Sequence, residues 1–254
     1  MREKEVKWAL ASLEGFSSPK AQHEQYATPP ELAVSALSLI EERFGDIKRK
    51  RVLDLGCGTG MLSAACLLFG AKEVTGVDID SAVEEIYARN MEYVSGLVEN
   101  RREIASASGT EDREISTAPE QLFDEKTGAP ENANSRSAPA LRKSKKKYAF
   151  YKRDIAKEGV GGLPQFDIAL TNPPFGTKNN EGIDVLFLEA ALSKSKVVYS
   201  MHKTSTRKYL QKKYGERIEV ISEMKFEIPK MYRFHKKESV HVDVDLIKVL
   251  RAEP

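Results

Sequence analysis

The segment Arg51 to Gly60, "RVLDLGCGTG", constrains the fold of this chain more than any other feature. Its first residues are mostly apolar and predict a short buried strand, which is followed directly by Gly56, Gly58 and Gly60. Glycines at this point let the backbone pass close to a ligand, and the apolar segment 61–71 predicts a helix whose free N–H groups face the same place. A dinucleotide-binding loop would carry its third glycine where Met61 stands, so the pattern indicates an α/β protein with a different ligand.

Strands and helices alternate along most of the chain. The patterns predict strands at 73–80, 148–155, 166–175 and 196–202, and helices at 3–16, 29–47, 81–97, 184–195 and 205–216. Two more strands, 217–228 and 239–250, enclose a basic turn and predict a hairpin. We therefore expect an α/β fold with a doubly wound, mostly parallel sheet, an antiparallel C-terminal edge hairpin and N-terminal helices within 1–48, all in a single domain of residues 1–254.

Residues 99–147 interrupt this rhythm. They are rich in Ser, Ala, Pro, Glu, Asn and Gly, and such a composition buries too little apolar surface to offset the entropy of ordering, so we expect a disordered insertion. The insertion ends in the basic cluster Arg142 to Lys147. That cluster is typical of a solvated charged surface, and an RNA-contacting arm or a localisation signal is the alternative.

The overall composition excludes several classes of protein. The two cysteines, Cys57 and Cys66, are too few for a disulfide scaffold or a four-ligand zinc site, so we expect no metal. No segment has the roughly 18 consecutive apolar residues of a membrane span, and the polar N-terminus is unlike a signal peptide. The formal net charge of +2 says little about partners. We expect an intracellular, soluble protein with no membrane partner.

Three acidic residues follow three successive predicted strands. Asp54 precedes the glycine loop, Asp78 ends the next strand about 20 residues later, and Asp154 follows the third. The carboxyl ends of parallel strands meet at one edge of the sheet, so we expect these acids to surround one site, with Asp78 accepting hydrogen bonds from ribose hydroxyls. A helix N-cap is the alternative role for Asp78, although Asp80 or Ser81 is better placed for it.

The tetrad Asn172-Pro173-Pro174-Phe175 follows the fourth strand at the same edge. Its prolines stop the strand. Such a turn could bind the exocyclic NH2 group of adenine. This amine is a poor nucleophile because its lone pair is delocalised into the adenine ring. If the Asn172 side-chain oxygen and the Pro173 carbonyl both accept hydrogen bonds from the NH2 group, the lone pair can face a methyl donor. Pro174 would stiffen the turn and Phe175 would stack on a flipped base.

Together, "DLGCGTG" and "NPPF" resemble class I S-adenosylmethionine-dependent methyltransferases that act on planar nitrogens. The resemblance implies a Rossmann-like fold and S-adenosyl-L-methionine as cofactor. Two activities share this chemistry: N6-methylation of adenine in nucleic acid, and N5-methylation of a glutamine in a protein such as a release factor. A non-catalytic RNA-binding assembly factor with a vestigial pocket is a third possibility.

Four further stretches are similar to the methyltransferase-like protein 5 family, eukaryotic enzymes that make N6-methyladenosine in small-subunit ribosomal RNA. They are 24–29, 172–192, 198–207 and 232–249. The family resemblance implies a heterodimer with a small zinc-binding activator subunit, location in the nucleus, including the nucleolus, and in the cytoplasm, and 99–147 as an insertion. The cofactor contacts that it implies are Gln25, Thr28, Asp54, Gly56, Thr59, Asp78, Asp154 and Ile155.

Basic residues cluster beside the later strands, and we expect them to hold RNA phosphates at the mouth of the cleft. The candidates are His202, Lys203, Arg207, His235, Lys236 and Lys237. A solvated surface charge is the alternative for each of them taken singly. Trp8 and Cys66 are expected in the core.

Overall fold

The computed structural model describes residues 2–107, 146–175, 181–229 and 239–253. These residues form a seven-stranded sheet with the strand order β3-β2-β1-β4-β5-β7-β6. The first five strands in this order are parallel, and β7 is antiparallel to both of its neighbours, which confirms the predicted mostly parallel sheet and edge hairpin. The strands are β1 (Arg51–Leu55), β2 (Glu73–Asp78), β3 (Tyr148–Lys152), β4 (Phe166–Thr171), β5 (Ser195–Lys203), β6 (Ile218–Pro229) and β7 (Ser239–Leu250).

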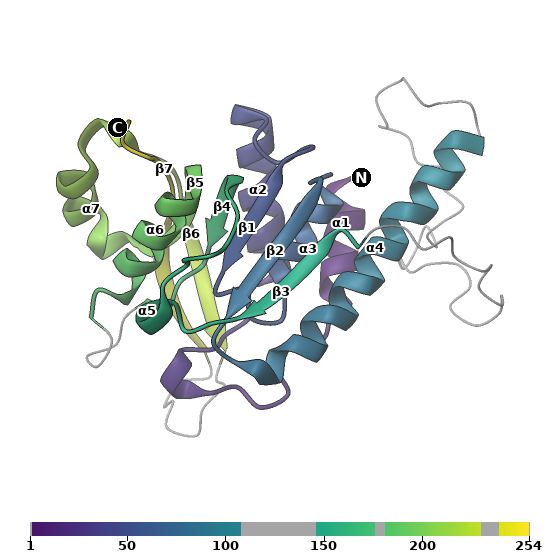
Figure 1. Ribbon diagram of the computed structural model, residues 1–254, viewed down its shortest axis with the longest axis horizontal. Coiled ribbons are helices and arrows are strands. Elements are labelled where there is room, and N and C mark those ends of the chain that lie inside the picture. Colours follow the sequence, from purple (N-terminus) through teal and green to yellow (C-terminus); the bar gives the residue numbers. More distant parts are fainter. Residues whose placement is uncertain (1, 108–145, 176–180, 230–238, 254) are drawn as a thin grey trace.

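Helices cover both faces of the sheet (Figure 1), as expected of a doubly wound fold. Helices α1 (Glu3–Ala11), α2 (Pro30–Phe44), α3 (Met61–Leu68) and α4 (Glu84–Ala107) share one apolar core. Helices α5 (Ile155–Glu158), α6 (Ile183–Lys194) and α7 (Arg207–Tyr214) share the other. Short 3-10 turns lie at η1 (Ala21–His23), η2 (Ser81–Val83), η4 (Thr204–Thr206) and η5 (Gly215–Arg217).

The local sequence explains where several helices begin and end. Pro30 occupies the first turn of α2, where its missing N–H costs nothing, and Gly45 ends that helix with a left-handed φ of 62°. Within the described residues, no helix is long and apolar enough to cross a membrane. Cys66 is fully buried and Trp8 packs partly buried against the first core, as expected of core residues.

Two expectations about the helices were wrong. The first helix ends at Ala11 instead of Phe16, because the chain then turns and brings the Phe16 ring against the glycine loop. Helix α4 continues to Ala107, so residues 99–107 are helical and do not belong to a disordered insertion. Arg101 on this extension reaches the buried Glu5 of α1 at 3.0 Å, a contact that ties the end of α4 to the body of the protein. Residues 108–145 lie outside the described part of the chain.

Candidate active site

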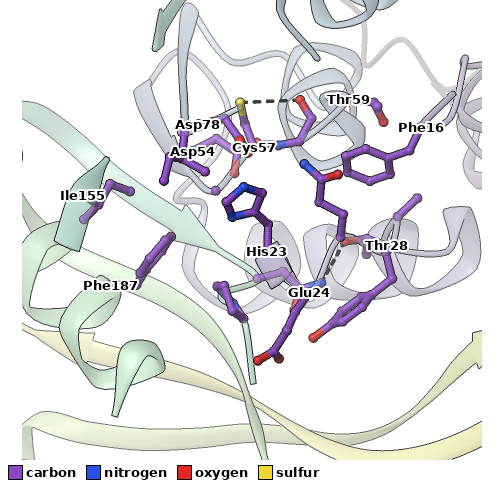
Figure 2. Close-up of a pocket in the computed structure, with 18 of the residues that line it drawn as sticks. Phe16, His23, Glu24, Thr28, Asp54, Cys57, Thr59, Asp78, Ile155 and Phe187 are labelled. Carbon is purple, nitrogen blue, oxygen red and sulfur yellow. Dashed lines mark hydrogen bonds between the residues drawn. The ribbon is translucent and has the colours of Figure 1, made fainter. Parts of the chain in front are cut away.

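A cavity of about 230 Å³ opens at the carboxyl ends of β1, β2 and β4. Its walls come from the N-terminal segment 22–28, the glycine loop, the ends of β2 and β3, the tetrad and the start of α6. Figure 2 shows the labelled side chains converging on this space from elements far apart in the sequence. The sheet therefore gathers the predicted cofactor residues into one site: Gln25, Thr28, Asp54, Gly56, Thr59, Asp78, Asp154 and Ile155 all line it.

The glycine loop is shaped by backbone conformation and by close neighbours. Gly56, Gly58 and Gly60 all have positive φ, between 51° and 93°, which other residues adopt only with strain. A Cβ atom on Gly58 would lie 2.8 Å from the Phe16 ring, and one on Gly56 would lie 3.0 Å from the Phe187 ring. A larger residue at either position would therefore have to displace an aromatic ring and adopt a strained φ, so glycine is favoured at both positions.

Asp54 lines the cavity and is buried. Its Oδ2 accepts a 2.6 Å hydrogen bond from the Ser63 hydroxyl, whereas its buried Oδ1 has no hydrogen-bond partner among the described residues. Burial raises the pKa of Asp54 to about 7, and the hydrogen bond from Ser63 offsets part of that rise. A buried carboxylate oxygen without a hydrogen-bond donor is unfavourable in free energy. A cation or an N–H group beside it would therefore stabilise the ionised Asp54.

Asp78 holds the glycine loop and also lines the cavity. Its Oδ2 accepts from the Gly58 N–H at 2.8 Å, and its Oδ1 accepts from the Asp80 N–H at 2.9 Å. Burial raises the pKa of Asp78, and these two backbone bonds oppose that rise. Each oxygen keeps a second lone pair, so Asp78 can still accept from hydroxyl groups. Asp80 caps the turn η2 through the Ala82 N–H, as expected.

Asp154 and Ile155 lie where β3 leads into α5. The Asp154 side chain caps that short helix by accepting from the N–H groups of Ala156 and Lys157, at 3.1 and 3.2 Å. Local sequence alone did not predict α5, which has only four residues. Its cap fixes the Asp154 carboxylate at the rim of the cavity, next to the buried Ile155.

The N-terminal segment forms the opposite wall. The Gln25 side chain donates to Asp80 at 2.8 Å and accepts from the Lys20 N–H at 2.9 Å, so its amide anchors the segment. Lys20 also pairs with Asp80 at 2.6 Å. Although burial by itself raises the pKa of Asp80, the hydrogen bonds from Lys20 and Gln25 lower it to about 2. Thr28, buried beside them, accepts a 3.0 Å hydrogen bond from the Asn172 amide.

The four tetrad residues differ in their placement. Asn172 and Pro174 line the cavity, and the Oδ1 atom of Asn172 is buried without a hydrogen-bond partner in the described part of the chain. Pro173 is buried. Phe175 is buried too, with its ring centroid 5.6 Å from Tyr26 and 5.8 Å from Phe226. The expectation that Phe175 stacks on a base is therefore not met in this structure, where the ring packs inside the core.

The predicted phosphate contacts lie in different environments. His202 is completely buried and lies 2.8 Å from the Ser200 hydroxyl and 3.1 Å from Asp184, so it is a core residue and a direct phosphate contact is wrong for it. Lys203 is partly exposed, with its Nζ 5.8 Å from the Phe175 ring centroid. His235, Lys236 and Lys237 lie outside the described residues.

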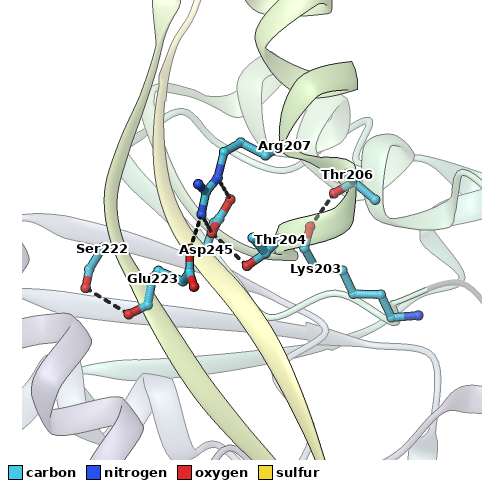
Figure 3. Close-up of polar contacts among 7 residues, drawn as sticks. All are labelled: Lys203, Thr204, Thr206, Arg207, Ser222, Glu223 and Asp245. Carbon is cyan, nitrogen blue, oxygen red and sulfur yellow. Dashed lines mark hydrogen bonds and ion pairs between the residues drawn. The ribbon is translucent and has the colours of Figure 1, made fainter.

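Arg207 is paired with two carboxylates of the protein (Figure 3). It contacts Asp245 through Nε and Nη2, both at 2.6 Å, and Glu223 through Nη2 at 2.5 Å. Hydrogen bonds to Asp245 and Glu223 raise the pKa of Arg207. Since Asp245 is only 1% exposed, this arginine neutralises a buried charge, and the structure does not support the expected phosphate contact.

The residues of the cavity wall that the sequence did not predict include Phe16, His23 and Phe187. Figure 2 shows the His23 ring directed into the cavity near Asp54 and Asp78. The charge of His23 lowers the pKa of Asp78, against the larger effect of burial. Residues so far apart in the chain give no local signal that they share a site.

The residues present fit S-adenosyl-L-methionine. A cationic ammonium suits the unpartnered Asp54 oxygen, and ribose hydroxyls suit Asp78. The close approach of backbone at Gly56 and Gly58 suits the cofactor's amino-acid end. No group of three or more His, Cys, Asp or Glu side chains able to hold a metal occurs among the residues that the structure describes.

Comparisons with known proteins agree with this chemistry. The chain is 33% identical over 252 residues to the rRNA N(6)-adenosine-methyltransferase METTL5 of Danio rerio, covering 98% of both chains. It is 34% identical to metl-5 of Caenorhabditis elegans, with 97% of each chain covered. The profile of the ribosomal protein L11 methyltransferase (PrmA) family matches residues 32–115. The solved structure of protein PH1948 from Pyrococcus horikoshii superposes with a TM-score of 0.70 at 29% identity, covering 100% of this chain and 99% of that one.

Proposed function

This chain belongs to the METTL5 family of rRNA N(6)-adenosine-methyltransferases, and from that premise we propose that it methylates N6 of an adenosine in small-subunit (18S) ribosomal RNA, with S-adenosyl-L-methionine as methyl donor. One observation carries the proposal. Asn172 lines the same cavity as the glycine loop and the acids Asp54 and Asp78, and its Oδ1 is buried without a hydrogen-bond partner among the described residues. A hydrogen-bond acceptor for an amine thus adjoins a site suited to the cofactor.

The chain's own residues would hold the cofactor at three points. When bound, S-adenosyl-L-methionine supplies an electrophilic methyl group. Asp54 would accept from its ammonium, and Asp78 would accept from its ribose hydroxyls. Phe16 and Phe187 would enclose the ligand from two sides and reduce its contact with water, which strengthens the electrostatic contacts inside.

Asn172 and Pro173 would act on the substrate. The adenine amine would donate one hydrogen bond to the Asn172 Oδ1 and one to the Pro173 carbonyl in an NPPF pocket, so that its lone pair turns toward the methyl group. The target base would have to leave its stack to reach this position. Lys203 at the end of β5, and His235, Lys236 and Lys237, are candidates for phosphate contacts.

The partner and the location follow from the same proposal. The sheet ends in two edge strands, β3 and β6, whose outer backbone groups have no strand beside them within the described residues. Tyr151 on β3 is 44% exposed. A small zinc-binding activator subunit would cover such an edge and stabilise the chain. Because the proposed substrate is ribosomal RNA, we propose that the protein is located in the nucleus, including the nucleolus, and in the cytoplasm.

A methyl-transfer assay tests the function. Purified protein is incubated with radiolabelled cofactor and an 18S ribosomal RNA fragment, with and without the activator subunit. We expect Asn172→Ala to bind cofactor normally but to lower kcat by about 100-fold or more, because the amine loses its acceptor. Asn100→Ala, at an exposed position on α4, is the matched control and should behave as wild type. Near-normal transfer by Asn172→Ala would refute the mechanism.

The same assay with a release factor added as a second substrate, together with calorimetry, separates the two alternatives. Label in the release factor, with none in RNA, would indicate amide methylation of glutamine. RNA binding without cofactor binding in calorimetry, even with the activator present, would indicate an assembly factor.

A further inference from the structure

Asn90 on helix α4 is a buried polar residue that the proposed reaction does not use. It is only 3% exposed, and its side-chain amide makes three hydrogen bonds to main-chain atoms of two distant segments. Its Oδ1 accepts from the Glu14 N–H at 2.9 Å. Its Nδ2 donates to the Glu14 carbonyl at 2.9 Å and to the Thr59 carbonyl at 2.8 Å. One side chain thus joins the glycine loop to the connection between α1 and η1, residues 12–20.

The partners of this amide fix its orientation. A main-chain N–H can only donate and a main-chain carbonyl can only accept. A flipped amide would place Nδ2 against the Glu14 N–H and Oδ1 against two carbonyl oxygens, so only one orientation makes the three bonds. An ionised aspartate has nearly the same shape but no donor, and it would face both carbonyl oxygens with an oxygen of its own. The three bonds therefore depend on an amide at position 90.

Both segments that Asn90 joins contribute to the wall of the cavity. Thr59 lines the cavity itself. Phe16 lies two residues after Glu14 and lines the cavity too, and a Cβ atom on Gly58 would lie 2.8 Å from its ring. Figure 2 shows Phe16 and Thr59 on the same side of the cavity. The bonds that hold Glu14 to Thr59 through Asn90 therefore fix how closely the Phe16 ring approaches the glycine loop.

The connection 12–20 is anchored at its other end as well, where Lys20 pairs with Asp80 at 2.6 Å. Near its start, a second contact lies beside Asn90: Arg89 pairs with the Glu14 carboxylate through Nε and Nη2, both at 2.8 Å. Both of these side chains are about half exposed, at 51% and 53%, so water and salt compete with the ion pair. The buried bonds of Asn90 are shielded from that competition.

We propose that Asn90 is a positioning residue for cofactor binding: its amide holds the connection 12–20 on the glycine loop and so keeps the Phe16 ring beside Gly58 as a wall of the cofactor site. This inference rests on the proposed function, because its ligand is the proposed cofactor. A wall that is already in place does not have to be ordered when the ligand binds, and the affinity is higher by that entropy. The effect of Asn90 on the cofactor is transmitted through Phe16.

Asn90→Ala and Asn90→Asp test the proposal in the full-length protein, by calorimetry with S-adenosyl-L-methionine at a temperature where circular dichroism shows each variant folded. We expect both variants to raise the cofactor Kd roughly 10-fold or more, because the connection 12–20 loses its buried anchor. The kcat at saturating cofactor should stay within about threefold of wild type, since Asn172 keeps its own contacts. Arg89→Ala removes only the exposed ion pair with Glu14, so it is the matched control and should leave Kd within about twofold.

Phe16→Ala separates a positioning role of Asn90 from a general contribution to stability. If Asn90 acts through the Phe16 ring, Asn90→Ala should raise Kd by less than about threefold further in a Phe16→Ala background. The full additional rise in that background would overturn the proposal, and so would a wild-type Kd in a folded Asn90 variant.

Hydrogen exchange gives a readout that needs neither a variant nor activity. In the wild-type protein without cofactor, the Glu14 amide should exchange at least about tenfold more slowly than an unstructured amide, because its acceptor is a buried side chain. Exchange at the unstructured rate would contradict the proposal even if both Asn90 variants failed to fold. A wild-type protein that binds the cofactor but methylates no RNA would refute the proposed function and leave the test of Asn90 intact.

Discussion

At the scale of single residues, burial of Asp54 has a consequence for stability. Burial raises its pKa to about 7 from an ordinary value near 4. Between these two pH values the folded chain binds more protons at Asp54 than the unfolded chain does. The free energy of unfolding of the cofactor-free protein therefore falls as pH rises through this window, with a limiting slope of about 1.4 kcal/mol for each pH unit. An ionised Asp54 is unfavourable until something cationic reaches it.

The raised pKa of Asp54 predicts pH-dependent cofactor binding. A cofactor ammonium beside Asp54 favours the ionised carboxylate and lowers its pKa, so binding near pH 6.5 should release protons, and affinity should rise with pH up to about 7. Calorimetry in two buffers of different ionisation enthalpy measures the release. Asp54→Asn should abolish most of it, while Asp243→Asn, at an exposed position on β7, should not. Equal proton release by wild type and Asp54→Asn would show that another group titrates.

Some site residues could be predicted from sequence and others could not, for a physical reason. Three site residues stand near or just beyond the ends of strands that are recognisable by their apolar residues: Asp54, Asp78 and Asn172. Parallel strands bring such ends together. The contact of Thr28 with Asn172 joins residues 144 positions apart. Such pairings depend on how the helices pack, which no local pattern encodes.

At the scale of elements, the corner between β5, α7 and β7 depends on one buried charge. Asp245 on β7 is 1% exposed and receives hydrogen bonds from Arg207 and from the Thr204 hydroxyl, the latter at 2.9 Å. From the sequence, the basic residues in this stretch were predicted to contact RNA phosphates. The sequence could not reveal that an acid on another strand lies beneath the arginine, because β7 pairs with β5 only in the folded sheet.

Removing this arginine should therefore lower the stability of the protein more than its affinity for RNA. Arg207→Ala leaves Asp245 buried and uncompensated, and we expect the melting temperature to fall by roughly 5 °C or more. Lys208→Ala, at the neighbouring exposed position, is the control and should leave the melting temperature unchanged. Thermal melts and RNA titrations of both variants check this. Unchanged stability of Arg207→Ala together with weaker RNA binding would restore the phosphate role.

At the scale of the whole molecule, the described residues build the sheet, both apolar cores and the cavity without residues 108–145. The described residues on either side of that segment also lie near each other. Burial lowers the pKa of Lys147, and the charges of Arg102 and Glu99 on α4 act on it as well, so the start of β3 is close to the last turns of α4. From Arg102 to the end of α4 the helix rises only about 8 Å. Since a ten-residue linker can span up to about 33 Å, a much shorter connection can close this gap.

Replacing residues 112–140 by a Gly-Ser linker of about ten residues should therefore leave the fold and the cofactor site intact. Composition led to the same expectation, although it put the start of the segment too early, because the pairing of Arg101 with Glu5 that accompanies the longer α4 was not visible in sequence. We expect a melting temperature within a few degrees of wild type and a cofactor Kd within about twofold. Retained cofactor binding with a large loss of transfer to RNA would make the segment an arm for the substrate. Loss of the folded state would instead show that the segment packs on the core, against the inference from composition.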